Sequence, residues 1–451
     1  MRLLVLSSMW DNSFLMDALS GIEERFEDID HSLHICNAYD LFSDAFSDSM
    51  ESKIYELSRY DKYDGVIIAC NTVGNKGGIV KALELLRKKG VPSVNLGSRV
   101  DGDAYVNVDY RKSIYGITEH LIKEHGCRRI NYIGGTKTTL GSQMRLKGFI
   151  DCLEDNGFEV EKDRILQLNY NYEDGLEAYE IFKRRGLHLP DAVVCANDNT
   201  ALGYCDAAGA DGFYAPKDFA ITGFDGITEA REYDPSITTV NPDWESMGFT
   251  GADILLKLMA GEPVETDYYS PGRLLQNKSC GCPNALEDSR ISALAKLNRS
   301  RRRRQIDANL KYMFQNLSRA KDAEDMLKKF TFIDNSLKMP LFALCINDNL
   351  LEGRKIAPDD GFGQSMKVLS KSGIGSSTLK EGIVPECLKG YFDKNILMFS
   401  PLYFNDIVFG YSIMQYSDGM LDFVKNGVFF TLVSNSLERM RLKLIIDKNN
   451  F

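Results

Sequence analysis

Short apolar runs alternate with amphipathic stretches of helix length over the first 283 residues. Arg2–Leu6, Gly65–Ala69 and Ser93–Leu96 have the length and composition of buried strands. Phe14–Phe26 and Gly78–Lys89 place apolar residues at helical spacing between these strands. Strands and helices in alternation predict βαβ units, and therefore an α/β fold built on a parallel sheet.

The alternation starts again at Ile130–Ile133, which is predicted to begin a second sheet. Over residues 106–241 four segments follow one another: VNVDYRKSIYGITEHLIKEHGCRRINYIGG, RLKGF, PDAVVCANDNTALG and ITGFDG. An isolated charged or amide residue stands where each strand is expected to end. Ligands bind beyond the carboxyl ends of the strands in an open parallel sheet. We therefore expect ligand contacts from Arg145, Asn197 and Asp225.

Residues 284–330 have a different pattern, which predicts a helical linker. No proline occurs between Pro283 and Pro340. Apolar residues fall at 4-3-4 spacing on one helix face, namely Ile306, Leu310, Met313 and Leu317. Two such helices are able to pair as a coiled coil, which favours a homodimer.

Residues 331–451 predict a third domain of α+β type. Phe342–Ile346 and Ile396–Phe399 have the composition of strands. A hairpin is expected next, with its turn at Asn405–Asp406, between Leu402–Phe404 and Val408–Met414. Residues 421–448 predict one long closing helix.

Length and composition describe a multidomain globular protein. At 451 residues, two or three domains are expected. The net charge of −10 argues against broad affinity for nucleic acids or anionic membranes. No run of 18 uncharged apolar residues occurs, so no membrane span is expected. The ten cysteines are scattered, many of them in apolar runs, which is typical of buried reduced thiols in a cytoplasmic protein.

The four segments quoted from residues 106–241 resemble the effector-binding core of the LacI/GalR family of bacterial regulators. This resemblance implies a two-lobed, type 1 periplasmic-binding-protein fold for residues 1–283. Its lobes would comprise approximately residues 1–126 plus 242–267, and 128–240 plus 268–283. It also implies a homodimer and a small polar effector, such as a sugar, bound between the lobes.

The resemblance gives each candidate site residue a role. Arg145 would donate bidentate hydrogen bonds to hydroxyls or a carboxylate, because a guanidinium carries five donors in fixed geometry. Asn197 would bracket a hydroxyl pair, while Asp225 and Asp109 would accept ligand protons. Aromatic side chains would close the pocket. These are Tyr170, Trp10 and Phe14.

Each of these residues also has a structural interpretation. An Asp or Asn after a strand is commonly a turn or cap residue, and we expect Asp198 to cap the following helix. Tyr110 stands where relatives often carry Asn, and Gly226 where a second Asp is common. These departures leave the identity of the ligand open.

The element order of residues 331–451 resembles that of a GAF domain. A sensor, a linker and a GAF domain occur in this order in regulators with a GGDEF or AraC-type output domain. The chain contains no GGDEF string, and Met1 leads straight into the first predicted strand. We therefore expect neither a cyclase nor a helix-turn-helix within it, and any output domain would be lost or separate. The basic cluster at Arg299 and Arg301–Arg304 is interpreted as a solvated linker face.

No catalytic residue, cofactor or metal site is predicted. P-loop, GxSxG and dinucleotide GxGxxG motifs do not occur. His120 and His125 are five residues apart on a predicted helix, which rotates their rings by about 140°, so we expect no shared metal. Cys280 and Cys282 supply two of four metal ligands. Structural packing is favoured for this pair, with a metal shared across a dimer or a redox couple as alternatives.

The sequence thus predicts a non-catalytic, cytoplasmic sensor that relays ligand-driven closure through its linker helices. One alternative is a LacI/GalR-type transcription regulator whose DNA-binding domain is absent or supplied by a partner, since direct DNA binding by this chain is not expected. Others are the sensory part of a truncated diguanylate cyclase, a sugar-active enzyme on a binding-protein scaffold, and a dimerisation scaffold with an empty cleft.

Overall fold

The computed structural model divides the chain into two compact units. The first unit comprises residues 1–107, 244–268 and 300–451, and the second comprises residues 108–243 and 269–299. The residues that the structure describes are 1–8, 12–38, 50–70, 76–100, 102–283, 304, 308, 310–337, 341–351, 362–363, 365–392, 395–416 and 428–449.

The amino-terminal part of the first unit is a parallel α/β layer. Its strands are β1 (Arg2–Ser8), β2 (Ser32–Ala38), β3 (Gly65–Cys70), β4 (Ser93–Gly97) and β5 (Ala104–Val108). β1 pairs in parallel with β2 and β3, and the pairing continues from β3 to β4 and β5. The connecting elements are α1 (Asn12–Arg25), the 3-10 helix η1 (Met50–Arg59), α2 (Lys76–Lys88) and α8 (Trp244–Met259). The predicted βαβ alternation and parallel sheet are confirmed.

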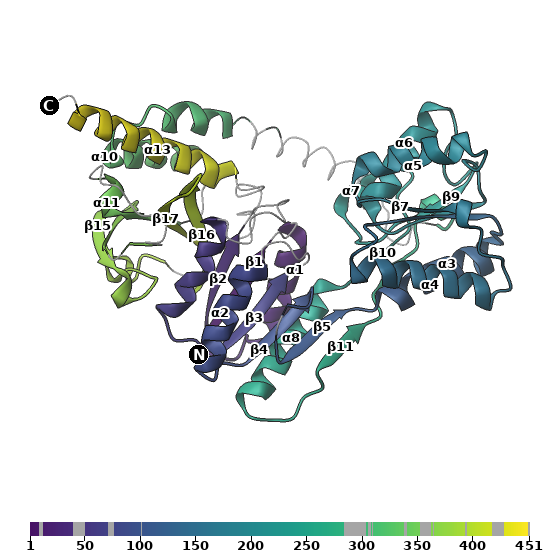
Figure 1. The fold of residues 1–451 in the computed structure, drawn as a ribbon, viewed down its shortest axis with the longest axis horizontal. Coiled ribbons are helices and arrows are strands. Elements are labelled where there is room, and N and C mark those ends of the chain that lie inside the picture. The colour runs from purple at the N-terminus through teal and green to yellow at the C-terminus, as the bar shows by residue number, and fades with distance from the viewer. Residues whose placement is uncertain are drawn as a thin grey trace. The chain divides into compact units, whose positions relative to one another are not determined.

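The carboxyl-terminal part continues this same sheet. β16 (Ile396–Phe404) runs parallel to β2, and Met398 is opposite Ile35. The remaining strands add antiparallel pairs, and they are β17 (Ile407–Gln415), β13 (Phe342–Asn347), β14 (Ser365–Ser370) and β15 (Gly373–Thr378). With β11 (Asp267–Ser270) beside β5, the described strands follow the order β11-β5-β4-β3-β1-β2-β16-β17-β13-β14-β15 (Figure 1). The predicted hairpin is present, with its turn at Asn405–Asp406.

Side-chain alternation along β1 explains how both faces of the sheet are covered. Leu3 and Val5 lie in one core, with residues of α1 and α8. Leu4 and Leu6 lie in the opposite core, with residues of η1 and α2. Because successive residues of a strand point to opposite faces, an apolar run such as LLVL suits a sheet that is buried on both sides.

Helices of the carboxyl-terminal part join the core that contains α1 and α8. Phe330 of α10 (Ala323–Leu337) and Phe429 of α13 (Val428–Asn449) are buried there beside Phe342. Met313 and Leu317, from the predicted linker helix, are fully buried in the same core. The helical face expected to form a coiled coil is therefore packed within the chain at these two positions.

The second unit is built on a four-stranded parallel sheet with the order β7-β6-β8-β9. Its strands are β6 (Ile130–Gly134), β7 (Ile165–Gln167), β8 (Ala192–Cys195) and β9 (Ala220–Thr222), and β10 (Thr239–Asn241) pairs separately with β12 (Arg273–Leu275). α3 (Tyr110–His125) and α4 (Leu140–Asp155) cover one face, whereas α5 (Tyr172–Arg184) and α6 (Asp198–Ala210) cover the other (Figure 1). Short elements complete the described chain, namely η2 (Lys162–Arg164), α7 (Thr228–Glu232), η3 (Lys278–Cys280), α11 (Asp348–Leu351), η5 (Leu379–Glu381) and η6 (Glu386–Leu388).

The boundary between the units falls before α3, at Asn107, and not at the predicted lobe boundary near residue 126. The reason is the close packing of α3 on α4. A side chain at Gly148 of α4 would overlap the backbone of Arg111 in α3. Helical periodicity predicts that residues 110–125 form a helix, but it does not identify the sheet on which the helix packs. None of the described helices is both long and apolar enough to span a membrane.

His34 makes the first unit sensitive to acid. This residue of β2 is 4% exposed, and its Nδ1 lies 3.1 Å from the hydroxyl of Tyr63. Burial lowers the pKa of His34 from the usual 6.5 to about 3, and the charge of Arg2 contributes. The folded state therefore excludes a proton that the unfolded chain binds below pH 6.5. The contribution of neutral His34 to the free energy of unfolding is complete above pH 6.5, and it is lost as the pH falls from 6.5 toward 3.

We predict that the first unit loses about 2 kcal/mol through His34 between pH 7 and pH 5, at about 1.4 kcal/mol per pH unit below 6.5. The His34→Gln variant should lack this contribution. Denaturant unfolding followed by tryptophan fluorescence measures it, because Trp10 and Trp244 both fall in the ranges of the first unit. His188→Gln, in the second unit, is the control. Equal pH dependence in the wild type and His34→Gln would contradict the prediction.

Candidate functional site

The buried guanidinium of Arg145 is the centre of the site in the second unit. The Arg145 side chain extends from α4 and is 11% exposed. Its guanidinium carbon lies 4.2 Å from the ring centre of Tyr110 and 4.3 Å from that of Phe224. Contact with two aromatic faces gives a buried cation part of the stabilisation that it loses with water.

Polar groups complete the surroundings of Arg145. Its Nη1 donates a hydrogen bond to the Tyr170 hydroxyl at 3.1 Å, and its Nη2 lies 3.8 Å from an oxygen of Asp225. Burial alone would lower the pKa of Arg145, but Tyr170, Tyr110 and Asp225 raise it above its usual value, so the guanidinium stays charged. Its buried Nε has no hydrogen-bond acceptor among the described residues. Such a buried, unsatisfied donor is rare in folded proteins.

Tyr170 is held in a specific backbone conformation after β7. Its φ of 73° lies in the left-handed region, which is uncommon for a residue other than glycine. The Tyr170 carbonyl accepts a hydrogen bond from the Asn197 side-chain amide at 2.7 Å. Its ring lies against Gly135, where any side chain would overlap it. These contacts direct the Tyr170 hydroxyl to Arg145.

Asn197 is the N-cap of α6. Its Oδ1 accepts a hydrogen bond from the Thr200 backbone at 3.1 Å, while its Nδ2 donates to Tyr170. We expected Asp198 to be the cap, but the cap is Asn197. Both polar atoms of the Asn197 side chain are thus engaged within the protein, and its direct contact with a ligand stays a prediction.

Asp198 holds the loop that carries Asp225. Its carboxylate is fully buried and accepts hydrogen bonds from the Thr239 hydroxyl at 2.6 Å and the Ile227 backbone at 2.9 Å. Burial and the charge of Asp225 raise the pKa of Asp198 well above its usual range. Asp225 adopts a φ of 103°, and its side chain is 41% exposed. The carboxylate of Asp225 therefore remains accessible beside Arg145.

The other predicted site residues occupy different positions. Asp109 caps α3 by accepting a hydrogen bond from the Lys112 backbone at 2.9 Å, which fixes the start of the helix that carries Tyr110. Phe14 is 5% exposed in the core of the first unit, beside Trp244. Trp10 lies outside the described residues. The structure thus brings Arg145, Tyr170 and Asp225 together.

Two site residues were not predicted from the sequence, namely the aromatic neighbours Tyr110 and Phe224. Their signal is their position, because Tyr110 follows Asp109 directly and Phe224 precedes Asp225 directly. An aromatic residue next to a polar residue at a strand end is able to form the wall of a polar pocket. This local signal is weak, because core residues occur at the same positions.

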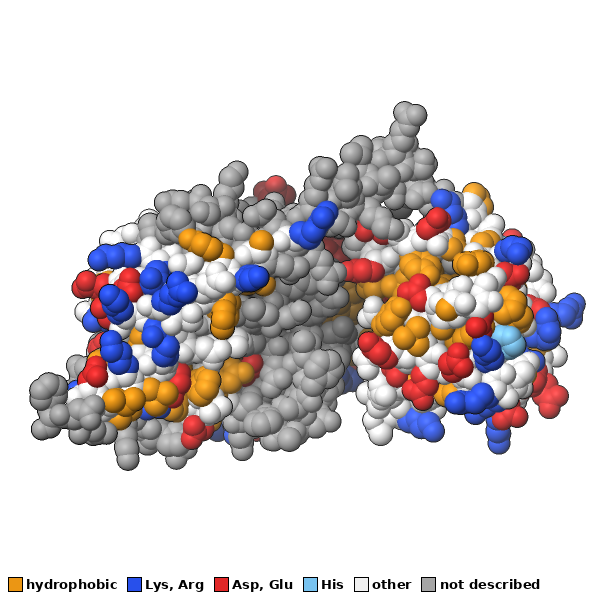
Figure 2. Space-filling view, turned by 90° about the horizontal axis from the view of Figure 1, so that it is seen from above, with side chains coloured by type: hydrophobic (Ala, Val, Ile, Leu, Met, Phe, Trp, Pro, Cys, Tyr) orange, Lys and Arg blue, Asp and Glu red, His pale blue; other side chains and the backbone are white. Residues whose placement is uncertain are grey.

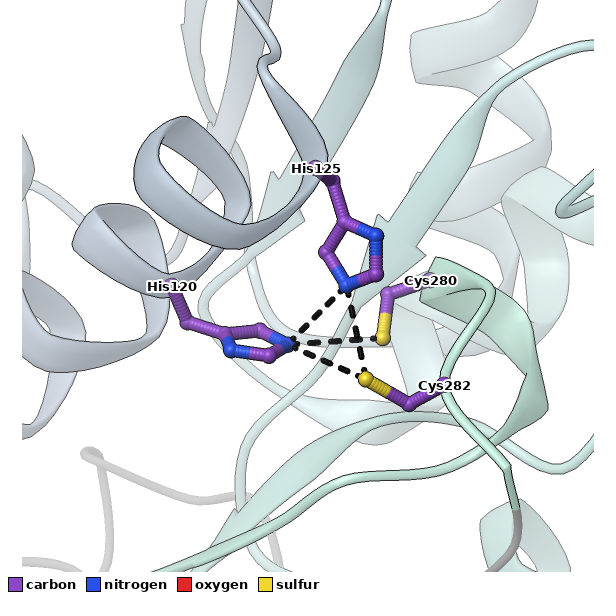
Figure 3. Close-up of side chains that lie close together, drawn as sticks. All are labelled: His120, His125, Cys280 and Cys282. Carbon is purple, nitrogen blue, oxygen red and sulfur yellow. Dashed lines mark hydrogen bonds between the residues drawn. The ribbon is translucent and has the colours of Figure 1, made fainter.

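A second group of side chains that carry potential metal ligands lies elsewhere in the second unit (Figure 3). His120 and His125 of α3 converge on Cys280 and Cys282, and the four ligand atoms all lie within 4.8 Å of one another. The expectation that the two histidines point apart is wrong, since their Nε2 atoms are 3.2 Å apart. His125 is the last residue of α3, where its side chain is free to turn back over the helix end.

The two cysteines differ in acidity. Burial alone would raise the pKa of Cys280, but hydrogen bonds with His120, Thr238 and Cys282 lower it to about 7. Burial and the charge of Cys280 raise the pKa of Cys282 to about 11. Cys280 is therefore the more acidic thiol of the pair.

The surface shows no single-sign field on the face that Figure 2 displays, where acidic and basic side chains are interspersed over the described residues. Of the predicted basic cluster, only Arg304 is described, and it is exposed. Arg299 and Arg301–Arg303 lie outside the described residues.

Sequence comparisons find similar proteins that are named as regulators. Residues 118–280 match the family model of the periplasmic binding protein-like domain. Catabolite control protein A of Staphylococcus xylosus is 28% identical over 219 residues, which are 48% of this chain and 64% of that protein. The HTH-type transcriptional repressor PurR of Pasteurella multocida is 32% identical over 143 residues, which are 32% of this chain and 42% of that protein. The chain thus spans less than two thirds of each of these relatives, which are named as regulators and not as enzymes.

Solved structures share the fold. The transcription regulator CcpA of Lactococcus lactis matches with a TM-score of 0.51 and 23% identity, over 62% of this chain and 98% of that one. The transcriptional regulator CelR in its cellobiose complex matches with a TM-score of 0.50 and 24% identity, over 61% of this chain and 84% of that one. The chain therefore contains a periplasmic binding protein-like domain, and it shares the α/β fold with parallel sheets of these solved regulators.

Proposed function

We propose that this chain is a non-catalytic sensor of a small polar metabolite, and that Arg145 is the principal ligand contact. The observation that carries the proposal is the unsatisfied Nε of a guanidinium that is about nine-tenths buried. A ligand oxygen that accepted this hydrogen bond would recover energy that the free protein forgoes, since a buried unpaired donor costs about 1–3 kcal/mol.

The charges at the site favour a neutral, hydroxyl-rich ligand. Asp225 lies 3.8 Å from Arg145 and offsets its positive charge, so an anionic ligand would meet a carboxylate as well as a guanidinium. A hydroxyl both donates and accepts, so it is able to use Arg145 as donor and Asp225 as acceptor. The rings of Tyr110 and Tyr170 supply apolar surface for the carbon face of a sugar. The solved structure of the similar regulator CelR is titled as a cellobiose complex, which supports a sugar by analogy.

The roles of the other predicted residues follow from this proposal. Tyr170 and Asp225 contact the ligand. Asn197 and Asp109 position the neighbouring backbone by capping α6 and α3. Trp10 and Phe14 remain predicted aromatic contributors to the pocket. Ligand binding shifts the population toward a closed form, provided that the ligand binds that form more tightly.

We propose that the carboxyl-terminal part relays the signal, and it keeps its proposed likeness to a GAF domain. Helix α10 and the segment that contains Met313 and Leu317 share one core with β1 and β2. Such packing is suited to relay a change from the sensor to α13. The proposal includes a homodimer in the cytoplasm and an output domain on a separate partner.

The second candidate function is regulation of transcription, which the names of the relatives favour. The chain would then act through a DNA-binding partner. We predict no retardation of duplex DNA by this chain alone at physiological salt, because of its net charge of −10. An electrophoretic mobility assay tests this, and sequence-specific retardation would show that the chain reads DNA itself.

The main proposal predicts that Arg145→Ala abolishes ligand binding. A thermal-shift screen of the full chain against neutral sugars, sugar phosphates, nucleobases and amino acids should give a neutral sugar as the strongest hit. Ligands that bind only the folded state raise the melting temperature by mass action. We expect Arg145→Ala to weaken the hit by at least about 100-fold, which corresponds to about 2.7 kcal/mol. Arg145→Lys should also weaken ligand binding, because a lysine ammonium lacks the planar, bidentate donors of a guanidinium.

Arg111→Ala is the matched control for this experiment. Arg111 is an exposed arginine of the second unit that pairs with Asp151, and its loss should leave the affinity unchanged. Unaltered affinity in Arg145→Ala would overturn the assigned site, and a strongest hit among the anions would overturn the choice of a neutral ligand.

Gly135→Ala is predicted to weaken ligand binding without touching the ligand. The added methyl group would overlap the ring of Tyr170 and move its hydroxyl away from Arg145. We expect an affinity loss of about 10-fold, roughly one hydrogen bond in size. Gly116→Ala is the control, because Gly116 lies in α3 with open space around it. Isothermal titration calorimetry measures the affinity of both variants for the identified sugar. Equal affinities would show that Tyr170 does not contribute to ligand binding.

A further inference from the structure

Four potential metal ligands in the second unit lie close together, with their ligand atoms all within 4.8 Å of one another. The Nε2 atoms of His120 and His125 are 3.2 Å apart. The Nε2 of His120 lies 3.6 Å from the Sγ of Cys280 and 3.6 Å from that of Cys282. The Nε2 of His125 lies 3.4 Å from the Sγ of Cys282.

These distances match a zinc site. With Zn–N bonds of about 2.0 Å and Zn–S bonds of about 2.3 Å, a tetrahedron separates two nitrogens by about 3.3 Å and a nitrogen from a sulfur by about 3.5 Å. Four of the six distances among the ligand atoms thus match tetrahedral zinc coordination, and the other two are no longer than 4.8 Å. We propose that His120, His125, Cys280 and Cys282 bind one zinc ion.

A network of hydrogen bonds alone does not account for this packing. Nε2 of His120 lies at contact distance from three ligand atoms, of His125, Cys280 and Cys282. Its single N–H is able to point at only one of them. A central cation would be bound by all four atoms at once. Thiolate and imidazole ligands in a tetrahedral arrangement favour zinc over magnesium or calcium, which prefer oxygen ligands.

Neighbouring polar groups support metal binding. The side-chain nitrogen Nε2 of Gln276 lies 3.4 Å from Nδ1 of His120, and rotation of the amide by 180° would place its oxygen there instead. With the amide oxygen turned to the ring, Nδ1 keeps its proton and Nε2 is left free to bind the metal. The Thr238 hydroxyl donates a hydrogen bond to Sγ of Cys280 at 3.0 Å, which stabilises a thiolate. Gly281, with a φ of 97°, makes the turn that brings both cysteines to one side.

The role that we assign to the zinc ion is structural. All four coordination positions are filled by protein side chains, so none is left for a substrate or water. The ion would fasten the end of α3 to the turn after η3, across 160 residues of sequence between His120 and Cys280. Binding requires that both thiols give up their protons to solvent, so the affinity for zinc should fall in acid.

Metal analysis of the purified full-length chain tests this proposal. We expect about one zinc ion per chain by mass spectrometry after gel filtration. Cobalt added to the chelator-treated protein should give the visible bands of a tetrahedral ion and a thiolate-to-cobalt charge-transfer band. Both readouts are independent of sugar binding. A negative result here would therefore contradict the zinc site and not the proposed function, and failure of sugar binding would not contradict the zinc site.

Cys282→Ser is the informative variant, because Cys282 is only partly buried and its loss should be tolerated by the fold. We expect it to lower zinc affinity by at least about 100-fold, and a chelator to lower the melting temperature of the wild type but not that of the variant. Cys387→Ser, which removes an exposed cysteine of the first unit, should retain the full zinc content.

Three results would overturn the proposal. The first is a wild-type chain that holds no zinc, either as purified or after addition of zinc under reducing conditions. The second is a cobalt spectrum without a charge-transfer band from thiolate. The third is a disulfide between Cys280 and Cys282 that persists under mild reduction, which would assign the pair to redox chemistry instead.

Discussion

Burial of a permanently charged guanidinium is the constraint that organises the second unit. An ion removed from water costs several kcal/mol unless other charges and dipoles replace the solvent. Here the replacement comes from the rings of Tyr110 and Phe224, the Tyr170 hydroxyl and the Asp225 carboxylate. This compensation is incomplete, because Nε has no acceptor among the described residues. An incomplete set of partners is what a binding site requires, because a fully satisfied arginine would gain nothing from a ligand.

Residues around Arg145 are held by groups that make no contact with it. Asp109 fixes the helix start next to Tyr110, Asn197 fixes the carbonyl of Tyr170, and Asp198 fixes the loop after Asp225. Each of these residues follows a strand, and each meets a backbone group. The polar residues after the strands thus form two classes, those that face the guanidinium and those that position the loops. A ligand would act mainly through the first class, whereas mutation of the second would change affinity and stability together.

The sequence predicts those helices and strands whose positions depend on the local spacing of apolar residues. β1, α2 and β6 lie close to their predicted positions because apolar spacing along one segment decides them. Asp225 was identified by the rule that ligands bind at strand ends, which needs only the strand order. Neither the sequence of β16 nor that of β2 specifies that the two strands pair, since an edge strand accepts any complementary partner. The contact of Phe14 with Trp244, about 230 residues away in the sequence, could not be predicted from local spacing either. The cysteine and histidine cluster depends on the same kind of distant contact, so no motif spacing could reveal it.

Helix α3 connects the proposed ligand site and the proposed zinc site of the second unit. Tyr110, at its first position, stacks on Arg145, and His125, at its last position, belongs to the cluster with the cysteines. A helix of 16 residues is about 24 Å long, so the two sites do not share solvent or side chains. A metal at the far end would restrain the helix as a rigid body, whereas the Asp109 cap and the contact of Gly148 with Arg111 hold the near end independently. Loss of the metal should therefore release the end of α3 near Gly126 first, while the geometry around Arg145 persists as long as α3 stays packed on α4.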